Sequence, residues 1–126
     1  MIVAIGSDIV QIQRLAISYE KYGNRLAEKI LSHGEVAELA ATKNKVAFLA
    51  KRFAAKEAAA KALGTGMRQG VHFKQIIVKH HADGAPYLVF VDAAAERASL
   101  LAVTTNHLTI TDEKDYALAF VVLESV

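Results

Sequence analysis

The fold is decided by the stretch Arg52-Phe53-Ala54-Ala55-Lys56-Glu57-Ala58-Ala59-Ala60-Lys61-Ala62-Leu63-Gly64-Thr65-Gly66. Alanine dominates this stretch and has the highest intrinsic helix propensity. We therefore predict one long helix over residues 45–63, ended by Gly64, which suits the left-handed conformation that follows many helices. Small side chains along this helix would also let another backbone approach it closely.

One acidic side chain stands out within the predicted helix. Residues 43–68 carry seven basic side chains, and Glu57 is the only acid among them. Glu57 and Lys61 are four positions apart, so they share one face of a helix. They form either a solvated ion pair on a packing helix or part of a site that holds a metal ion and a polyphosphate together. The spacing alone leaves both interpretations open.

Length and composition limit the class of protein. The 126 residues suit a single domain over residues 1–126, and 53% of them are hydrophobic. The absence of cysteine excludes disulfides, thiolate nucleophiles and Cys-ligated zinc, and fits a cytoplasmic protein. No apolar run reaches the roughly 20 residues of a membrane span, and the first residues do not resemble a signal peptide.

The net charge of +2 hides an asymmetry along the chain. The basic residues gather in the centre, whereas residues 83–126 carry seven acidic side chains and two basic ones. A basic centre suggests an anionic partner, which could be phosphate, an acidic protein or nucleic acid. Nucleic acid is disfavoured because the only aromatic residues in the basic cluster, Phe48 and Phe53, fit a buried helix stripe.

Hydrophobic periodicity and turn signals predict an α+β fold with a largely antiparallel sheet and one long Ala-rich helix. A short strand should end at Gly6-Ser7, which leaves Asp8 as a turn residue, a helix cap or a ligand. Ser32 and Glu35 have the spacing of a capping box. In the long helix, Arg52 and Lys56 fall on a stripe next to the main apolar one. The predicted helices are 12–22, 25–31, 33–41, 45–63 and 93–103 (capped by Asp92), and the predicted strands are 2–5, 73–79, 86–91, 107–111 and 116–124.

Two separated motifs carry a family resemblance. The segment Gly6-Ser7-Asp8-Ile9-Val10 is similar to the pattern Gly-x-Asp-Ile-Val, and residues 52–66 are similar to Arg-Phe-x-x-Lys-Glu-Ala-x-x-Lys-Ala-x-Gly-Thr-Gly. The turn Gly84-x-Pro86 and the pair Tyr116-Ala117 match as well. On these residues the whole chain resembles the small bacterial holo-acyl-carrier-protein synthases, which are 4'-phosphopantetheinyl transferases.

The resemblance implies an enzyme of fatty acid biosynthesis. It would transfer the phosphopantetheine arm of coenzyme A to a serine of an acyl carrier protein and release adenosine 3',5'-bisphosphate. Carried over to this sequence, the Mg²⁺ ligands would be Asp8 and Glu57. Two carboxylates suit Mg²⁺, which keeps several waters and binds phosphate oxygens. Lys61 matches the second lysine of the motif and would contact the phosphates.

The resemblance also assigns coenzyme A contacts, to Lys43, Arg52, Lys61, Gly64, Pro86 and His107. Arg52 and Lys43 could equally be solvated, and His107 could be an ordinary residue near the end of a strand. Many members carry Ser-x-Ser-His near the C-terminus, whereas this chain has Thr109-Ile110-Thr111-Asp112. No histidine base can therefore be assigned there. The serine proton could go to water, to Asp112 or to Glu57.

The expected protein partners are an acidic carrier protein and further copies of this chain. The family places its carrier near the early helices, so we expect docking at Arg14, which lies in the first motif, and at Lys21 and Arg25. The family forms homotrimers with active sites between subunits, and the Ala-rich helix and the apolar last strand would suit such contacts. Two other classes compete with this interpretation. A binding module for phosphorylated ligands leaves Asp8 unexplained, and a small RNA-binding protein would bind in a strongly salt-dependent way without Mg²⁺ chemistry.

Overall fold

The computed structural model describes residues 1–126. Its elements follow the chain in the order β1 (Ile2–Gln11), α1 (Ile12–Tyr22), α2 (Asn24–Ile30), α3 (His33–Ala40), α4 (Lys45–Ala62), the 3₁₀ helix η1 (Phe73–Gln75), β2 (Ile76–His80), β3 (Pro86–Phe90), α5 (Asp92–Leu100), β4 (Thr105–Asp112) and β5 (Tyr116–Glu124). The predicted α+β class is confirmed.

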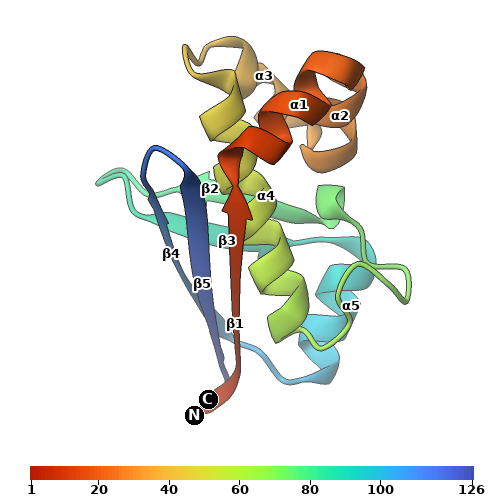
Figure 1. Ribbon diagram of the computed structural model, residues 1–126. Coiled ribbons are helices and arrows are strands. Elements are labelled where there is room, and N and C mark those ends of the chain that lie inside the picture. The colour runs from red at the N-terminus through yellow and green to blue at the C-terminus, as the bar shows by residue number, and fades with distance from the viewer.

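Two antiparallel sheets lie against the long helix. One contains three strands in the order β1-β5-β4, and the other is the β2–β3 hairpin. Asn106 of β4 joins them, because its side-chain amide exchanges two hydrogen bonds of 2.9 Å with the backbone of Leu88 in β3. Figure 1 shows α4 running along the three-stranded sheet, with α1–α3 gathered at one end of the molecule and both termini at the other.

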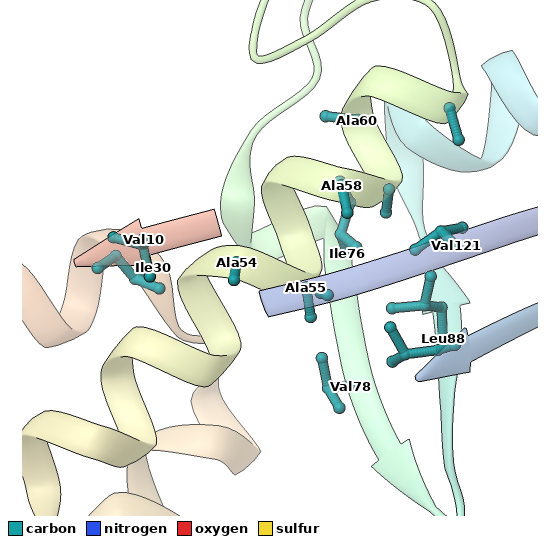
Figure 2. Close-up of a cluster of buried hydrophobic side chains, with 14 of the residues drawn as sticks. Val10, Ile30, Ala54, Ala55, Ala58, Ala60, Ile76, Val78, Leu88 and Val121 are labelled. Atoms are coloured by element: carbon teal, nitrogen blue, oxygen red, sulfur yellow. The ribbon is translucent and has the colours of Figure 1, made fainter. Parts of the chain in front are cut away.

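The alanines of α4 form the centre of the core. Ala50, Ala54, Ala55 and the run 58–60 have no exposed surface, and Figure 2 shows several of them among apolar side chains such as Val121 of β5. Small side chains let both sheets approach the helix closely. Because the alanine face is buried inside the chain, the prediction that it would serve contacts between subunits is wrong.

β1 approaches α4 at a glycine. A Cβ atom placed on Gly6 would lie 2.0 Å from the backbone oxygen of Ala58 and 2.8 Å from the backbone nitrogen of Ala62. No side chain fits in that space, so only glycine allows this contact between the strand and the helix. Asp8 lies two residues further along the same face of β1, since alternate residues of a strand point to one side.

The first strand is more than twice as long as the sequence indicated. We expected it to end at Gly6-Ser7, but β1 pairs with β5 as far as Gln11 opposite Tyr116. Gly6 is needed for the close contact with α4 and not for a turn. The prediction was wrong because glycine was interpreted as a turn residue. Asp8 is therefore a strand residue opposite Ala119, and the turn and cap interpretations are wrong.

Most other boundaries agree with the sequence within a few residues. The long helix is Lys45–Ala62, the last strand is Tyr116–Glu124, and the capping box at the start of α3 is formed. The strand expected at 73–79 begins instead with the 3₁₀ turn η1. Asp92 is the first residue of α5 rather than its N-cap, which is Val91.

The outer face of the three-stranded sheet has no covering element. Ile5 and Ile9 of β1 are each 60% exposed, and Leu118 and Phe120 of β5 point to the same side and are exposed. Strand alternation sends their neighbours into the core. None of the helices combines the length and the apolarity that crossing a bilayer would require.

Candidate active site

The contact between β1 and α4 brings Asp8 and Glu57 together. Asp8 lies on the face of β1 that packs against α4, and Glu57 belongs to the turn of α4 that receives Gly6. Asp8 and Glu57 are 49 positions apart in the chain. They meet because Gly6 and Ala58 let the backbones of β1 and α4 approach closely. The sequence singled out both residues, and the fold places them at one site.

Lys61 completes this cluster. Its Nζ donates to Oδ1 of Asp8 at 2.9 Å and to the backbone oxygen of Ser7 at 3.1 Å. The Lys61 side chain is 52% exposed and that of Asp8 is 16% exposed. The lysine therefore forms its ion pair across to the strand. Within the helix, no ion pair joins it to Glu57 at 4 Å or less, so the solvated i,i+4 pair is not formed.

The electrostatics of the cluster favour an added cation. Burial and the nearby Asp8 carboxylate raise the pKa of Glu57, and Lys61 offsets them only in part. Two carboxylates lie near one lysine, which pairs only with Asp8, so the site holds an excess of negative charge. A divalent cation would relieve it. No three or more acidic, histidine or cysteine side chains are placed to hold one metal ion together, so a bound cation would keep oxygen ligands from water or substrate.

A second set of predicted residues surrounds a cavity of about 240 Å³, which we call the Arg52 cavity. Arg52 and Pro86 line it, and so does Asp112 at the end of β4. Only Nη1 of Arg52 is engaged by carboxylates, at 3.0 Å from Glu35 and 2.8 Å from Glu38. The complete lining is Phe48, Lys51, Arg52, His80, Gly84, Pro86, Ile110 and Asp112.

The other predicted coenzyme A contacts lie apart from the cavity lining. Lys43 is exposed in the loop before α4, and Gly64 follows α4 with a φ of 82°, as a helix-ending glycine should. His107 lies on the outer face of β4 and pairs with Glu124 of β5. The structure therefore does not bring all six predicted residues to one place in a single chain.

The predicted carrier-docking residues are exposed on the first two helices. Arg14 and Lys21 belong to α1, and Arg25 belongs to α2. Lys21 lies over the ring of Tyr22, with Nζ 5.3 Å from its centroid. This end of the molecule therefore presents several positive charges to solvent.

Comparison with known proteins agrees with this geometry. The family described as the 4'-phosphopantetheinyl transferase superfamily matches residues 4–121. The chain belongs to this superfamily. A holo-[acyl-carrier-protein] synthase of Shewanella frigidimarina is 51% identical over 124 residues, which cover 98% of each chain. The expectation of a phosphopantetheinyl transferase, drawn from the two motifs, is confirmed.

Solved structures of the superfamily share the fold. The crystal structure of holo-[acyl-carrier-protein] synthase from Neisseria meningitidis has a TM-score of 0.93 and 41% identity, covering 99% of this chain and 100% of that one. The synthase from Bacillus anthracis, in complex with CoA (3',5'-ADP), has a TM-score of 0.83 and 36% identity, covering 100% and 99%. The similarity therefore extends over the whole fold.

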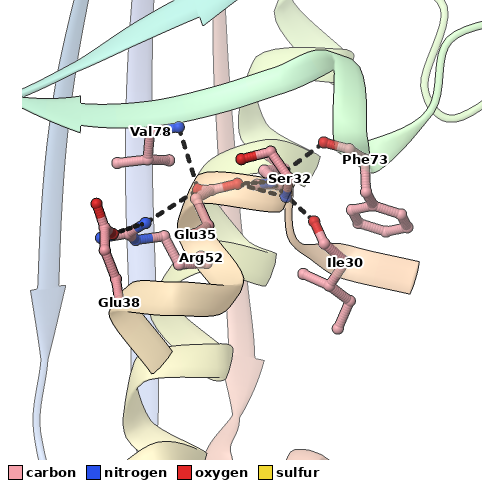
Figure 3. A network of polar contacts seen from close by, with 8 residues as sticks. Ile30, Ser32, Glu35, Glu38, Arg52, Phe73 and Val78 are labelled. Atoms are coloured by element: carbon pink, nitrogen blue, oxygen red, sulfur yellow. Dashed lines mark hydrogen bonds and ion pairs between the residues drawn. The ribbon is translucent and has the colours of Figure 1, made fainter. Parts of the chain in front are cut away.

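Two buried charges of this transferase escaped the sequence analysis. Lys56 has no exposed surface, and Glu35 is 2% exposed. Nζ of Lys56 donates to Oε1 of Glu35 at 2.6 Å, and Figure 3 shows Glu35 among Ser32, Arg52 and Val78. The capping box indicated Glu35 only as a local cap, and a lysine among alanines in a helix gives no signal of burial.

The surroundings of the buried pair match the ionised form of both residues. Burial alone would raise the pKa of Glu35, but Lys56, the Ser32 N–H and Arg52 together hold that pKa below its usual range. Burial lowers the pKa of Lys56, while its Nζ has three oxygen acceptors. An ammonium has three N–H donors to match them, whereas a neutral amine has two. The geometry therefore fits the charged form of both residues.

Proposed function

We propose that this chain, acting as a single domain over residues 1–126, transfers the 4'-phosphopantetheine of coenzyme A to a serine of an apo acyl carrier protein. The serine oxygen forms a new bond to the β-phosphorus, the phosphoanhydride bond breaks, and adenosine 3',5'-bisphosphate leaves. The observation that carries this proposal is the meeting of Asp8, Glu57 and Lys61 where β1 contacts α4. Family membership supports the reaction class.

Asp8 and Glu57 are the residues that would hold Mg²⁺. Their excess negative charge and their carboxylate oxygens suit a hard divalent cation. When bound, Mg²⁺ would neutralise charge on the diphosphate and make its phosphorus more electrophilic. Asp8 sits on a strand in the middle of a ladder and Glu57 on a buried helix, so both carboxylates are held on rigid elements.

Lys61 would stabilise the leaving bisphosphate. Its ammonium is half exposed and held by two oxygens, so it can exchange them for phosphate oxygens when coenzyme A binds. A fixed positive charge near the developing charge on the leaving group lowers the barrier. Lys61 needs no large movement for this, because it already lies beside the carboxylates.

The Arg52 cavity is the place we propose for part of coenzyme A. Arg52 keeps the donors of Nε and Nη2, Pro86 forms part of the wall, and the cavity is open to solvent. The Bacillus anthracis relative was solved with CoA (3',5'-ADP), which supports coenzyme A as the donor. Gly64 and Lys43 would contact the same ligand outside the cavity.

For the serine proton we propose Asp112 as the acceptor, with water and Glu57 as the alternatives. Asp112 lines the Arg52 cavity and is a carboxylate that no cation of the chain engages within 4 Å. Replacing Asp112 with Asn should lower kcat. An unchanged kcat would exclude Asp112.

The protein partners follow from two exposed surfaces. Arg14, Lys21 and Arg25 would dock the acidic carrier protein, and their effect should weaken with salt. The apolar outer face of β1 and β5 would form the contacts of a homotrimer. His107 shares that face, so it would reach coenzyme A across a subunit boundary. We place this activity in the cytoplasm, in fatty acid biosynthesis.

The oligomer has its own test. Changing Phe120 to Lys puts a charge at the centre of the exposed apolar face and should reduce a trimer of the wild type to monomers in sedimentation velocity. A wild-type protein that sediments as a monomer at micromolar concentration would exclude the trimer.

The reaction is tested by the intact mass of an apo acyl carrier protein after incubation with this protein, coenzyme A and Mg²⁺. We expect a gain of one phosphopantetheine, lost with EDTA and in a variant carrying Asp8→Ala and Glu57→Ala. A variant with Asp115→Ala and Glu96→Ala is the matched control, since it also removes one aspartate and one glutamate, both exposed. Transfer that survives in the first variant would exclude Asp8 and Glu57 as essential ligands. No transfer by the folded wild type would exclude the function.

A further inference from the structure

The buried lysine of α4 is fully engaged by three separate elements. Nζ of Lys56 donates to the backbone oxygen of Ile30 at the end of α2 at 2.7 Å, to Oε1 of Glu35 in α3 at 2.6 Å, and to the backbone oxygen of Phe73 in η1 at 3.2 Å. Each of its three N–H groups has a partner. The side chain therefore has one permitted direction.

Glu35 fixes the other end of this contact. Its carboxylate also accepts from the backbone N–H of Ser32 at 2.9 Å and from that of Val78 in β2 at 3.2 Å, and from Nη1 of Arg52 at 3.0 Å. Figure 3 shows Ser32 just before α3, Arg52 of α4 and Val78 of β2 converging on Glu35. Glu35 is thus bonded to α4 and β2, two elements that the apolar core already holds in contact.

Stability is a weak explanation for such a pair. Removing two charges from water costs about as much as their attraction returns, and well-packed apolar side chains often replace a buried ion pair without loss. What an ion pair with directed hydrogen bonds adds is a defined orientation. The alanines of α4 add less to this orientation, because a methyl group makes no directed contact.

Orientation matters because Lys56 immediately precedes Glu57. Successive residues of an α-helix point about 100° apart, so a fixed direction for Lys56 also fixes the direction in which Glu57 leaves α4. Lys56 is directed toward α2, α3 and η1, and Glu57 lies near Asp8 on β1. A rotation of α4 about its axis would move Glu57 away from Asp8.

We propose that Glu35 and Lys56 are positioning residues, which hold the rotation of α4 so that Glu57 faces Asp8. Both side chains are buried, so neither would touch the substrate or the cation. Lys56 and Glu35 act through the helix, and the part of this inference that concerns turnover rests on the proposed function.

The test uses four variants of the full chain: Lys56→Met, Glu35→Gln, the double variant with both changes, and the control Lys74→Met, which alters an exposed lysine of η1. Three quantities are measured for each. They are Tm, the Kd of Mn²⁺ in the presence of coenzyme A by electron paramagnetic resonance, and kcat and KM for the apo carrier.

The double variant separates positioning from stability. Lys56→Met alone leaves a buried carboxylate without its main partner and should lower Tm markedly. The double variant removes that charge and should recover most of the Tm. If the pair positions Glu57, the double variant still binds Mn²⁺ about tenfold more weakly than the wild type, the low end of what lost outer contacts cost a metal site. Its kcat should fall by a similar factor, with KM for the carrier changed less than threefold, and Lys74→Met should match the wild type.

A double variant that regains the Mn²⁺ affinity and kcat together with Tm would overturn the proposal, because the pair would then be only structural. A wild type that binds no Mn²⁺ with coenzyme A present would overturn it as well. A wild type that binds Mn²⁺ but transfers nothing would contradict the proposed function alone, and the Mn²⁺ affinities of the variants would still decide the role of the pair.

Discussion

Lys56 and Lys61 stand five positions apart in α4 and have opposite surroundings. Lys56 has no exposed surface and three acceptors, whereas Lys61 is half exposed and shares Asp8 with solvent. Each lysine pairs with an acid from another element, yet only Lys61 can change its partner when a ligand arrives. The comparison shows how one helix can carry both a fixed internal contact and a reactive group, separated by little more than one turn.

The largest effect on stability should come from Lys56→Met. The change leaves Glu35 buried with less compensation, and breaking one partner of a buried pair lowers the free energy of unfolding by about 3–5 kcal/mol. Urea unfolding measures it. Lys61→Met, the same substitution at the exposed site, should change stability by less than about 1 kcal/mol. Equal losses of unfolding free energy in the two variants would contradict the difference between a buried Lys56 and an exchangeable Lys61.

Lys61→Met, which should change stability little, should strongly reduce activity. Lys61→Met should reduce kcat roughly 100-fold, as for the loss of one donor to a developing charge. Steady-state kinetics at saturating Mg²⁺ measures it, with the exposed Lys114→Met as control. A kcat within threefold of the wild type would mean that Lys61 only neutralises Asp8.

The two perturbed carboxylates should give opposite dependences of stability on pH. The pKa of Glu35 is lowered in the folded protein, so its stabilising contribution is present above the ordinary value of 4.5 and is lost as pH falls through the folded pKa. The pKa of Glu57 is raised, so its contribution is present below 4.5 and is lost as pH rises through the folded pKa.

Substitution tests this difference in sign. Glu57→Gln should increase the free energy of unfolding at pH 7 and have less effect at pH 4, because at pH 7 the wild type bears the unfavourable charge. Glu35→Gln should decrease it at pH 7, and the decrease should shrink below pH 4.5. Urea unfolding between pH 3.5 and 7 measures both. The same sign for the two variants would contradict the assigned environments.

The sequence predicted what depends on local pattern. Alanine propensity and the following glycine gave α4 to within one residue, and the β-prone run at the end gave β5. The family motifs identified Asp8 and Glu57 and so anticipated their meeting. Gly6, by contrast, indicated a turn, because sequence alone does not reveal that a helix backbone occupies the space of its missing side chain.

The buried ion pair of Lys56 and Glu35 could not be predicted from the sequence, for a different reason. The partners of Lys56 lie 17–26 positions away along the chain, on three elements. A lysine in an amphipathic pattern is normally solvated, and only the tertiary structure shows which acid lies opposite. Arg52 was predicted to contact phosphate or solvent, yet two carboxylates engage it as well.

The central claim is that Asp8 and Glu57 act as one unit by holding the same cation, and a double-mutant cycle on kcat/KM tests it most directly. Asp8→Asn and Glu57→Gln should each reduce kcat/KM roughly 1,000-fold, equivalent to about 4 kcal/mol. Because either change removes the function of the shared ion, the double variant should lose at most about tenfold more than the worse single variant. Losses that multiply in the double variant would show that the two carboxylates act independently and would contradict the shared site.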